Sequence, residues 1–502
     1  MSEKMNVLFI ITDQQRADHL GCYGNKTLKT PNIDKLANDS IRFSNAFCAN
    51  PMCMPNRATL LTGLYPNMHG VRSNGINLSE EIPTITDTLR SRGWYTKAIG
   101  KMHLQFNFPP YKRSSESYEM ISQWNRPKTA NQMRNRFKSP YYGFEDVEIT
   151  LGHGDLMSGH YIDWLEEKSP KHVLEIKKRF TKFFDNLMYK TTLPEELYPT
   201  TYVKERTINF LEKYAKGDYG EKPFFLHCSI PDPHHPVCPP GNYYDMYDPD
   251  KIELPESFSN KNSLYEHHIL GEHLKNPIFS GATLRDSSEE EIREFIALTY
   301  GSISMIDHNV GEILATLHKL GLEDNTMVIY TSDHGDLSGD HGLLLKGPCP
   351  FSGILNVPLL WKIPKITKGK LSDALISSID IPPTILNLLK IRDRHHPPDI
   401  QGYDFSEVIK NQKDKIRDCC FIEEDEEIKN LKFRLRHLVT ENYKLTMYES
   451  AQIGDLFHRK NDPHELHNLW FENEKVRNEL VLKMLNESLK TQSRYPKRAS
   501  LT

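Results

Sequence analysis

Strand-like and helix-like segments alternate along most of this chain. Short apolar runs rich in β-forming residues are typical of buried strands, and they occur at residues 6–11, 94–99, 223–230, 326–331 and 357–361. Stretches with helical character lie between them, at Asn32–Asp39, Ile85–Arg92, Tyr202–Tyr214 and Glu289–Leu320. This alternation predicts an α/β fold built on a large, mostly parallel sheet sandwiched by helices.

The length of 502 residues exceeds what one ordinary hydrophobic core supports, so we expect a large domain and a smaller one. We place the large α/β domain at residues 1–390 and a polar, proline-bearing linker at 391–416. Two irregular stretches of the large domain, 105–200 and 239–286, are interpreted as insertions that set specificity, because loops on a rigid scaffold commonly carry function.

The remaining residues, 417–502, predict a small C-terminal α+β domain with an antiparallel sheet. Phe433–Thr440 and Tyr443–Tyr448 have the pattern of a β-hairpin, and a terminal helix is expected near Glu474–Lys490. A basic tail with no predicted fold begins at Ser493.

Charge and hydropathy limit the classes of partner. The net charge of -4 gives no reason to expect nucleic acid or an anionic membrane as the main partner. No apolar run approaches the ~20 residues of a membrane span. The N-terminus lacks the basic, apolar and small-residue pattern of a signal peptide, so we expect a cytoplasmic location.

Ionisable side chains follow four of the predicted strands, at the point where each strand ends. They are Asp13, then Lys101 and His103, then His234, and finally Asp333 with His334. Ligands of open α/β sheets bind beyond the carboxyl ends of the strands. We therefore expect these side chains to share one site at that edge of the sheet.

Asp13, Asp333 and His334 are candidate metal ligands within this group. Oxygen-rich ligand sets suit Ca²⁺ or Mg²⁺, and an imidazole shifts the preference towards Mn²⁺. Each residue also has a structural interpretation, because an aspartate after a strand often caps a helix and Asp-His-Gly is a common turn.

Cys53 stands out among eight cysteines that form no C-x-x-C pair. It lies two residues before Pro55 and four before Arg57, at the start of a predicted short helix that ends at Gly63. The N-terminal dipole of such a helix favours negative charge. The other seven cysteines are expected to be reduced and structural.

Three further segments join Cys53 in a recognisable set: Gly100-Lys101-Met102-His103-Leu104, Pro233-His234-His235-Pro236, and Asp333-His334-Gly335 followed by Lys346. Together with Cys-x-Pro-x-Arg, they resemble the motifs of the sulfatases, a branch of the alkaline phosphatase superfamily. The resemblance extends over nearly the whole chain. It implies hydrolysis of sulfate monoesters, either aryl or alkyl and sugar esters.

The resemblance also implies the nucleophile and the metal. Cys53 would be oxidised by a maturation enzyme to formylglycine, whose hydrated aldehyde attacks the ester. Residue 53, Asp13, Asp333 and His334 would bind one divalent ion, Ca²⁺ or Mn²⁺.

The remaining roles fall on charged and titratable residues. Arg57, Lys101 and Lys346 would stabilise the negative charge that develops on the ester oxygens. His103 and His234 would transfer protons. By the same resemblance, Lys101, His234 and Lys346 would contact the substrate.

Some positions depart from the usual sulfatase pattern. Gln14 stands where many sulfatases have a second aspartate, and His334 where they often have asparagine. This pairing resembles the formylglycine-dependent phosphonate monoester and phosphodiester hydrolases, and so does Asn74. Gln14 and Asn74 are therefore candidate substrate-binding residues. Lys101 and His103 favour sulfate esters, because that group does not usually carry them.

Two alternatives stay open at this point: a phosphonate monoester or phosphodiester hydrolase on the same scaffold, and a catalytically silent binding protein in which Cys53 is unmodified. A homo-oligomer is compatible with the sequence, but its composition does not predict one.

Overall fold

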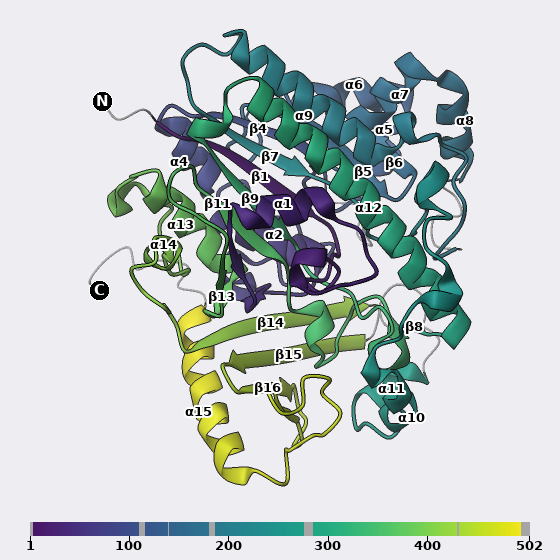
Figure 1. The fold of residues 1–502 in the computed structure, drawn as a ribbon, viewed down its shortest axis with the longest axis vertical. Helices are drawn as coiled ribbons and strands as arrows, with labels where there is room; N and C mark the ends of the chain where they lie inside the picture. The colour runs from purple at the N-terminus through teal and green to yellow at the C-terminus, as the bar shows by residue number, and fades with distance from the viewer. Residues whose placement is uncertain are drawn as a thin grey trace.

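In the computed structural model, which describes residues 4–109, 116–138, 140–179, 186–275, 285–428 and 431–492, nine strands form a mixed central sheet (Figure 1). The strand order is β12-β2-β11-β9-β1-β7-β4-β5-β6. Neighbours from β9 to β5 run parallel, whereas β11 and β6 run antiparallel to the strands beside them. The strands are Asn6–Thr12 (β1), Ile41–Phe43 (β2), Tyr95–Lys101 (β4), Asp146–His153 (β5), Leu156–Gly159 (β6), Phe224–Ser229 (β7), Thr326–Ser332 (β9), Leu359–Lys362 (β11) and Lys370–Ser372 (β12).

Helices cover both faces of this sheet. One face carries α1 (Pro31–Asn38), α9 (Pro199–Ala215) and α12 (Glu289–Lys319). The other carries α2 (Cys53–Thr62), α4 (Ile85–Ser91) and α13 (Ile381–Leu388). The α/β sandwich predicted from the alternating pattern is therefore confirmed.

Strand β1 shows why the pattern reads as a continuous apolar run. Phe9 belongs to the hydrophobic cluster on the α2 side, and its neighbours Leu8 and Ile10 belong to the cluster on the α12 side. Side chains alternate across a strand, so a strand buried on both faces is apolar at every position.

Shorter elements complete the large part of the molecule. The helices are α3 (Pro66–His69), α5 (Ile121–Trp124), α6 (Pro127–Arg136), α7 (His160–Lys168), α8 (Pro170–Arg179), α10 (Lys261–Leu264), α11 (Leu270–Leu274) and α14 (Ser406–Ile409). Two small strand pairs join β3 (Ala46–Phe47) to β13 (Ile376–Ser377) and β8 (Arg285–Asp286) to β10 (Leu343–Leu344).

The stretch 105–200 holds more of the central sheet than its sequence suggests. We find no strand there from sequence, but β5 and β6 lie within it and extend the sheet beyond β4. The interpretation of this whole stretch as an insertion is therefore wrong for residues 146–159. Apolar residues of β5 alternate with polar ones and so form no continuous apolar run of the kind that marks the other strands.

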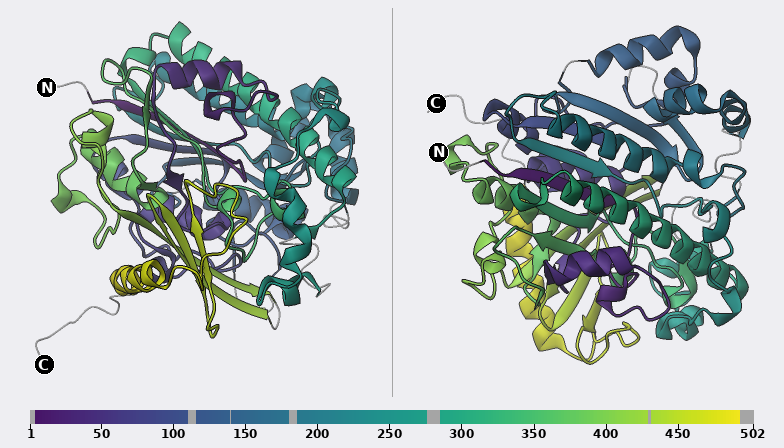
Figure 2. Two further views of the ribbon diagram at one scale, coloured as in Figure 1. Left: turned by 60° about the horizontal axis from the view of Figure 1, so that its bottom comes forward. Right: turned by 45° about the horizontal axis from the view of Figure 1, so that its top comes forward.

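A separate antiparallel sheet lies at the C-terminal end, as the right and left views of Figure 2 show. Its strands are Cys419–Ile428 (β14), Leu431–Thr440 (β15), Tyr443–Tyr448 (β16) and Asp455–His458 (β17), and α15 (Glu474–Thr491) packs beside it. The predicted hairpin and terminal helix are both present. The basic tail from Ser493 lies outside the described residues.

The sequence analysis did not predict strand β14, because the centre of this strand is acidic. Asp425 is nevertheless buried, and it pairs with Arg436 of β15 at 2.7 Å. Cross-strand ion pairing lets a charged segment occupy a sheet whose other positions are apolar.

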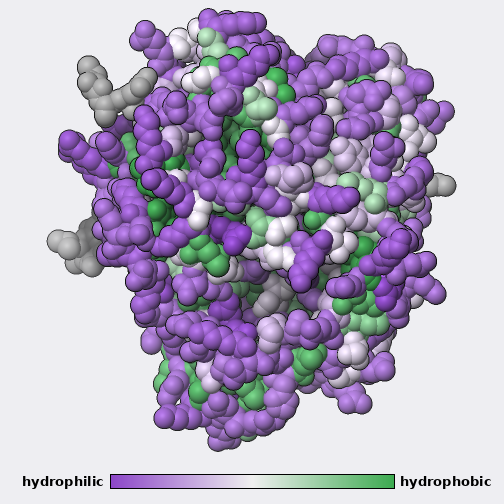
Figure 3. All heavy atoms as spheres, viewed as in Figure 1, coloured by the Kyte–Doolittle hydropathy of each residue, from purple (hydrophilic) through white to green (hydrophobic). Residues whose placement is uncertain are grey.

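The segment predicted as a linker, 391–416, packs on the large sheet through Phe405. This ring lies edge-on to Phe43 and Trp361, with ring centres 5.4 Å and 5.1 Å away. Hydrophilic residues cover most of the face shown in Figure 3, with apolar residues in small groups between them. Among the described helices, none combines the length and apolar character needed to cross a membrane.

Candidate functional site

Two neighbouring strands bring the predicted metal ligands together. β1 and β9 are parallel, and Thr12 pairs in register with Ser332, so Asp13 and Asp333 emerge side by side. Ligand atoms of Asp13, Asp333, His334 and Cys53 all lie within 4.8 Å of one another, and all four residues are buried. The sequence prediction that the strand ends meet at one site agrees with this arrangement.

Helix α2 presents Cys53 at its first position. Met52 is extended before it, and the helix ends at Gly63 in the left-handed conformation, as its sequence suggests. The Asn56 side chain donates a hydrogen bond to the backbone oxygen of Asp333 and accepts one from the amide of Ala49 at 3.0 Å. The start of α2 is thereby fixed against the end of β9.

Positive charge surrounds the Cys53 sulfur. Sγ lies 3.1 Å from Nζ of Lys346 and 3.1 Å from Nε2 of His334. Burial and Asp13 raise the pKa of the thiol, but Lys101, Lys346 and His334 outweigh them, and the pKa is lowered. An anionic group at this position is therefore electrostatically favoured.

The ligand set fits a divalent cation. Burial opposes ionisation of Asp13, yet Lys101 and Arg57 hold the pKa of its carboxyl well below the usual range. Nδ1 of His334 lies 2.8 Å from the carbonyl oxygen of Gly335, which directs Nε2 towards the carboxylates. A metal-binding imidazole is commonly oriented by such a contact.

Arg57 links the residues of this cluster through hydrogen bonds. Its Nε donates to Oδ2 of Asp333 at 2.8 Å, and Nη1 donates to the Lys101 carbonyl and the Ser229 hydroxyl, both at 2.9 Å. Nη2 lies 3.6 Å from Asp13. One guanidinium group thus connects the ends of four strands, β9, β4, β7 and β1.

Lys101 and Lys346 approach the cluster from two sides. Lys101 forms an ion pair with Asp13, and its side chain is 1% exposed. Nζ of Lys346 lies 3.0 Å from Nε2 of His234 and 2.9 Å from Nε2 of His334. Both ammonium groups therefore lie where they can meet the oxygens of a bound anion.

The two predicted proton-transfer histidines, His103 and His234, are both buried. Burial, reinforced by the lysines, lowers the pKa of His103 and of His234 well below the usual value, so both rings are neutral at neutral pH. Nδ1 of His234 contacts the carbonyl oxygen of His235 at 2.5 Å, which leaves Nε2 for Lys346. His103 has a φ of 52°, an uncommon backbone state that often marks functional positions.

Gly100 shows why the Gly-Lys-x-His sequence needs its glycine. Its φ is 100°, and a Cβ at this position would lie 1.8 Å from the carbonyl oxygen of Ser229 on β7. Any side chain would push β4 away from β7 and displace Lys101.

Gln14 and Asn74 occupy different places around the cluster. The backbone amide of Gln14 donates to Oδ1 of Asp333 at 3.1 Å, and its side-chain amide contacts Asp336 and, at 3.3 Å, Nδ1 of His235. Asn74 accepts a hydrogen bond from the amide of Met54 at 3.0 Å, which caps the first turn of α2. Substrate contact by either residue stays a prediction.

The sequence analysis missed His153. This residue ends β5, its Nε2 lies 3.0 Å from Nζ of Lys101, and its ring stacks on that of His234. The alternation of Val147, Ile149 and Leu151 before Gly152 was a strand signal that could have placed it at the same edge of the sheet.

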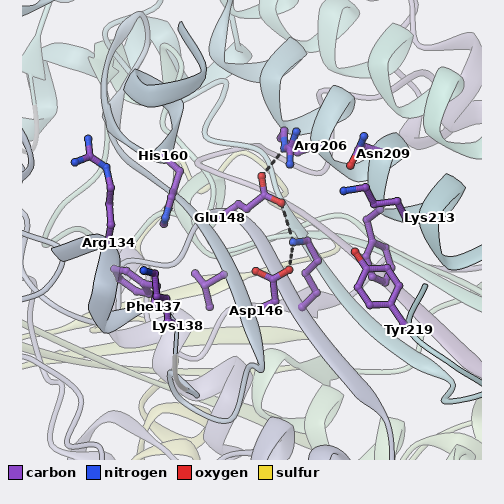
Figure 4. Close-up of a pocket in the computed structure, with 13 residues that line it drawn as sticks. Arg134, Phe137, Lys138, Asp146, Glu148, His160, Arg206, Asn209, Lys213 and Tyr219 are labelled. Carbon is purple, nitrogen blue, oxygen red and sulfur yellow. Dashed lines mark hydrogen bonds and ion pairs between the residues drawn. The ribbon is translucent and has the colours of Figure 1, made fainter. Parts of the chain in front are cut away.

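A separate cavity of about 390 Å³ lies near the amino ends of β4 and β5 (Figure 4). Lys97 pairs there with Asp146 and Glu148, and Glu148 also pairs with Arg206 of α9. This cavity is at the opposite end of both strands from Lys101 and His153. Its lining has five lysine and arginine side chains and two carboxylates, so the wall keeps an excess of positive charge.

Comparisons with known proteins agree with this site. The Sulfatase family model matches residues 5–391, and the model for the C-terminal part of N-sulphoglucosamine sulphohydrolase matches residues 339–494. An arylsulfatase of Clostridium perfringens is 29% identical over 479 residues, with 93% of this chain and 90% of that protein covered.

Two further comparisons extend this picture. The multifunctional alkaline phosphatase superfamily protein PehA of Trinickia caryophylli is 28% identical, with 93% of this chain and 91% of that protein covered. The crystal structure of the phosphonate monoester hydrolase of Agrobacterium radiobacter has the same fold, with a TM-score of 0.78, 23% identity, and coverage of 99% of this chain and 98% of that one.

Proposed function

The chain belongs to the sulfatase family, and from that membership we propose that it hydrolyses sulfate monoesters at Cys53 after this residue is oxidised to formylglycine. The observation that carries the proposal is the meeting of the Cys53 sulfur with two carboxylates, one imidazole and two ammonium groups in a buried cluster. We propose the same residues for the site as the motifs predicted.

The charges of the site match the charge that moves in the reaction. Cleavage of a sulfate ester places negative charge on the non-bridging oxygens and on the leaving oxygen. Preorganised cations in a dry site stabilise such charge strongly. Contacts already hold these cations in place: Arg57 donates to the Lys101 carbonyl, and Lys346 contacts His234. Little reorganisation of the side chains is therefore needed during the reaction.

Formylglycine and a divalent metal ion would both act at residue 53. Hydrated formylglycine would supply an oxygen nucleophile at the position of Sγ and a second hydroxyl through which sulfate can leave. One divalent ion, Ca²⁺ or Mn²⁺, would sit among Asp13, Asp333, His334 and residue 53 and lower the pKa of a hydroxyl there.

We assign proton transfer to His234 with Lys346 and to His103. Nζ of Lys346 lies 3.0 Å from Nε2 of His234, so this pair can deliver a proton to the leaving alcohol. His103 is neutral and 8% exposed, which suits it to accept a proton when sulfate is released.

The same scaffold supports a second candidate function, hydrolysis of phosphonate monoesters or phosphodiesters. Gln14 and His334 are shared with that group by resemblance. Lys101 and His103 favour sulfate, because by resemblance the phosphonate and phosphodiester hydrolases do not usually carry them. The alcohol, whether aryl or alkyl and sugar, depends on segments away from the cluster.

The test is a comparison of esters on enzyme coexpressed with a formylglycine-generating enzyme and loaded with metal. We expect kcat/KM on aryl, sugar or choline sulfate to exceed that on a phenylphosphonate monoester or a phosphodiester. Cys53→Ala is the control for contaminating activity. Higher kcat/KM on the phosphorus esters would replace the sulfatase proposal by the second candidate.

A further inference from the structure

His153 and His234 form a stacked pair at the wall of the site. Their ring centres are 3.7 Å apart, with 9° between the planes. The two rings come from different strands, since His153 ends β5 and His234 follows β7. β4 lies between these strands and ends at Lys101. The stack therefore bridges over the end of β4.

Each ring of the pair also contacts one lysine. Nε2 of His153 lies 3.0 Å from Nζ of Lys101, and Nε2 of His234 lies 3.0 Å from Nζ of Lys346. The order Lys101, His153, His234, Lys346 is thus a continuous row of contacts around Cys53. Both ends of the row reach the cluster, Lys101 through Asp13 and Lys346 through the Cys53 sulfur.

The chemistry of the contacts assigns a direction to each hydrogen bond. An ammonium group only donates, so Nε2 of His153 accepts from Lys101. Burial and the Lys101 charge lower the pKa of His153 well below its usual value, which agrees with a neutral ring. A neutral imidazole beneath His234 is also a favourable neighbour for a ring that gains charge during proton transfer.

We propose that His153 is a positioning residue for ester hydrolysis, which holds the ammonium group of Lys101 through Nε2 and the ring of His234 through stacking. It does not itself touch the reacting atoms. Its two contacts fix the spacing between the cation that meets the non-bridging oxygens and the histidine that serves the leaving group. The inference rests on the proposed ester hydrolysis but not on the choice between sulfur and phosphorus.

Two substitutions separate the two contacts. His153→Phe keeps a ring for stacking on His234 but removes the acceptor for Lys101. His153→Gln keeps an acceptor near the position of Nε2 but removes the stack. His172→Gln is the control, because His172 is a buried histidine of α8 whose ring contacts Ser169, away from the cluster.

We expect His153→Phe to lower kcat about 10–100-fold with KM nearly unchanged, and by a similar factor on all esters. His153→Gln should lower kcat more on esters of poor leaving groups than on 4-nitrophenyl esters, because the proton donor is misplaced. His172→Gln should keep the wild-type values. Thermal melting of each variant shows whether it is folded.

The inference is overturned if both folded variants keep the wild-type kcat and leaving-group dependence. It is also overturned if each variant loses activity only in proportion to lost thermal stability, since His153 would then be merely structural. These readings use whichever ester the wild-type enzyme hydrolyses. Failure of the sulfatase proposal shows instead as a wild-type enzyme that prefers phosphorus esters.

Discussion

Arg57 donates a hydrogen bond from Nε to Oδ2 of Asp333 at 2.8 Å, and neither side chain is more than 3% exposed. This contact takes up one carboxylate oxygen of Asp333 and turns the other, Oδ1, towards His334. The backbone amides of Gln14 and His334 also donate to Oδ1. Arg57 therefore orients a proposed metal ligand.

Replacing Arg57 by lysine should weaken metal binding about 10–100-fold, because a lysine cannot hold Asp333, Lys101 and Ser229 at once. Titration of metal-free protein with Ca²⁺ or Mn²⁺ by calorimetry measures the change. Arg206→Lys, which alters an ion pair with Glu148 in the separate cavity, is the matched control. Equal metal affinities for wild type and Arg57→Lys would show that Arg57 does not orient the metal ligand.

Gly100→Ala should destabilise the fold by about 2–3 kcal/mol and abolish activity, because its Cβ would collide with the Ser229 carbonyl beside the site. Gly24→Ala is a matched control, since Gly24 has a φ of 104° with no atom within 4 Å of the added Cβ. The difference between the two free energies of unfolding, measured in urea, isolates the collision. Similar losses for both would contradict it.

Glu119 should make stability depend on pH. Its carboxyl accepts hydrogen bonds from the amides of Leu104 and Gln105 and from the Tyr141 hydroxyl, yet burial outweighs these and raises its pKa from 4.5 to about 7. Between these pH values the folded protein binds more protons than the unfolded chain. The contribution of Glu119 is therefore fully present below pH 4.5 and is lost as pH rises through about 7.

Glu119→Gln removes this titration and keeps an oxygen for the amides. The free energy of unfolding of wild type relative to Glu119→Gln should fall by about 3 kcal/mol between pH 4.5 and 8. Denaturant melts of both proteins across that range measure it. Glu116→Gln, at an exposed neighbour, should track wild type. A parallel pH course for wild type and Glu119→Gln would refute the assignment.

The modification of Cys53 is directly measurable. Formylglycine is lighter than cysteine, so the peptide that spans Cys53 should have a lower mass after coexpression with a formylglycine-generating enzyme. The same peptide should keep the cysteine mass in Arg57→Ala, if Cys-x-Pro-x-Arg is the recognised motif. Unmodified thiol in all wild-type molecules under these conditions would favour the silent binding protein.

The sequence predicts the fold and most of the site because both depend on local patterns. Buried parallel strands such as β1 are apolar throughout their middle, here from Val7 to Ile11, and their ends are followed by residues such as Asp13 and Asp333. The meeting of Asp13 with Asp333 follows from the topology, since β1 and β9 are neighbours in register.

The parts that the sequence did not predict depend on partners distant in the chain. The acidic part of β14 pairs with residues distant in the chain, such as Arg436. β5 alternates polar and apolar residues. The role of its last residue, His153, depends on stacking with His234, which the sequence of β5 does not show. Neither pairing has a signal within one segment of sequence.

The central claim is that residue 53 attacks the ester and that its second hydroxyl releases the product. Cys53→Ser tests it most directly, because serine has one hydroxyl. With a 4-nitrophenyl sulfate substrate, we predict a burst of about one equivalent of nitrophenol and an intact mass increased by one SO₃ group, carried on the oxygen of residue 53. Steady multiple turnover by Cys53→Ser, with no sulfated protein, would contradict the mechanism.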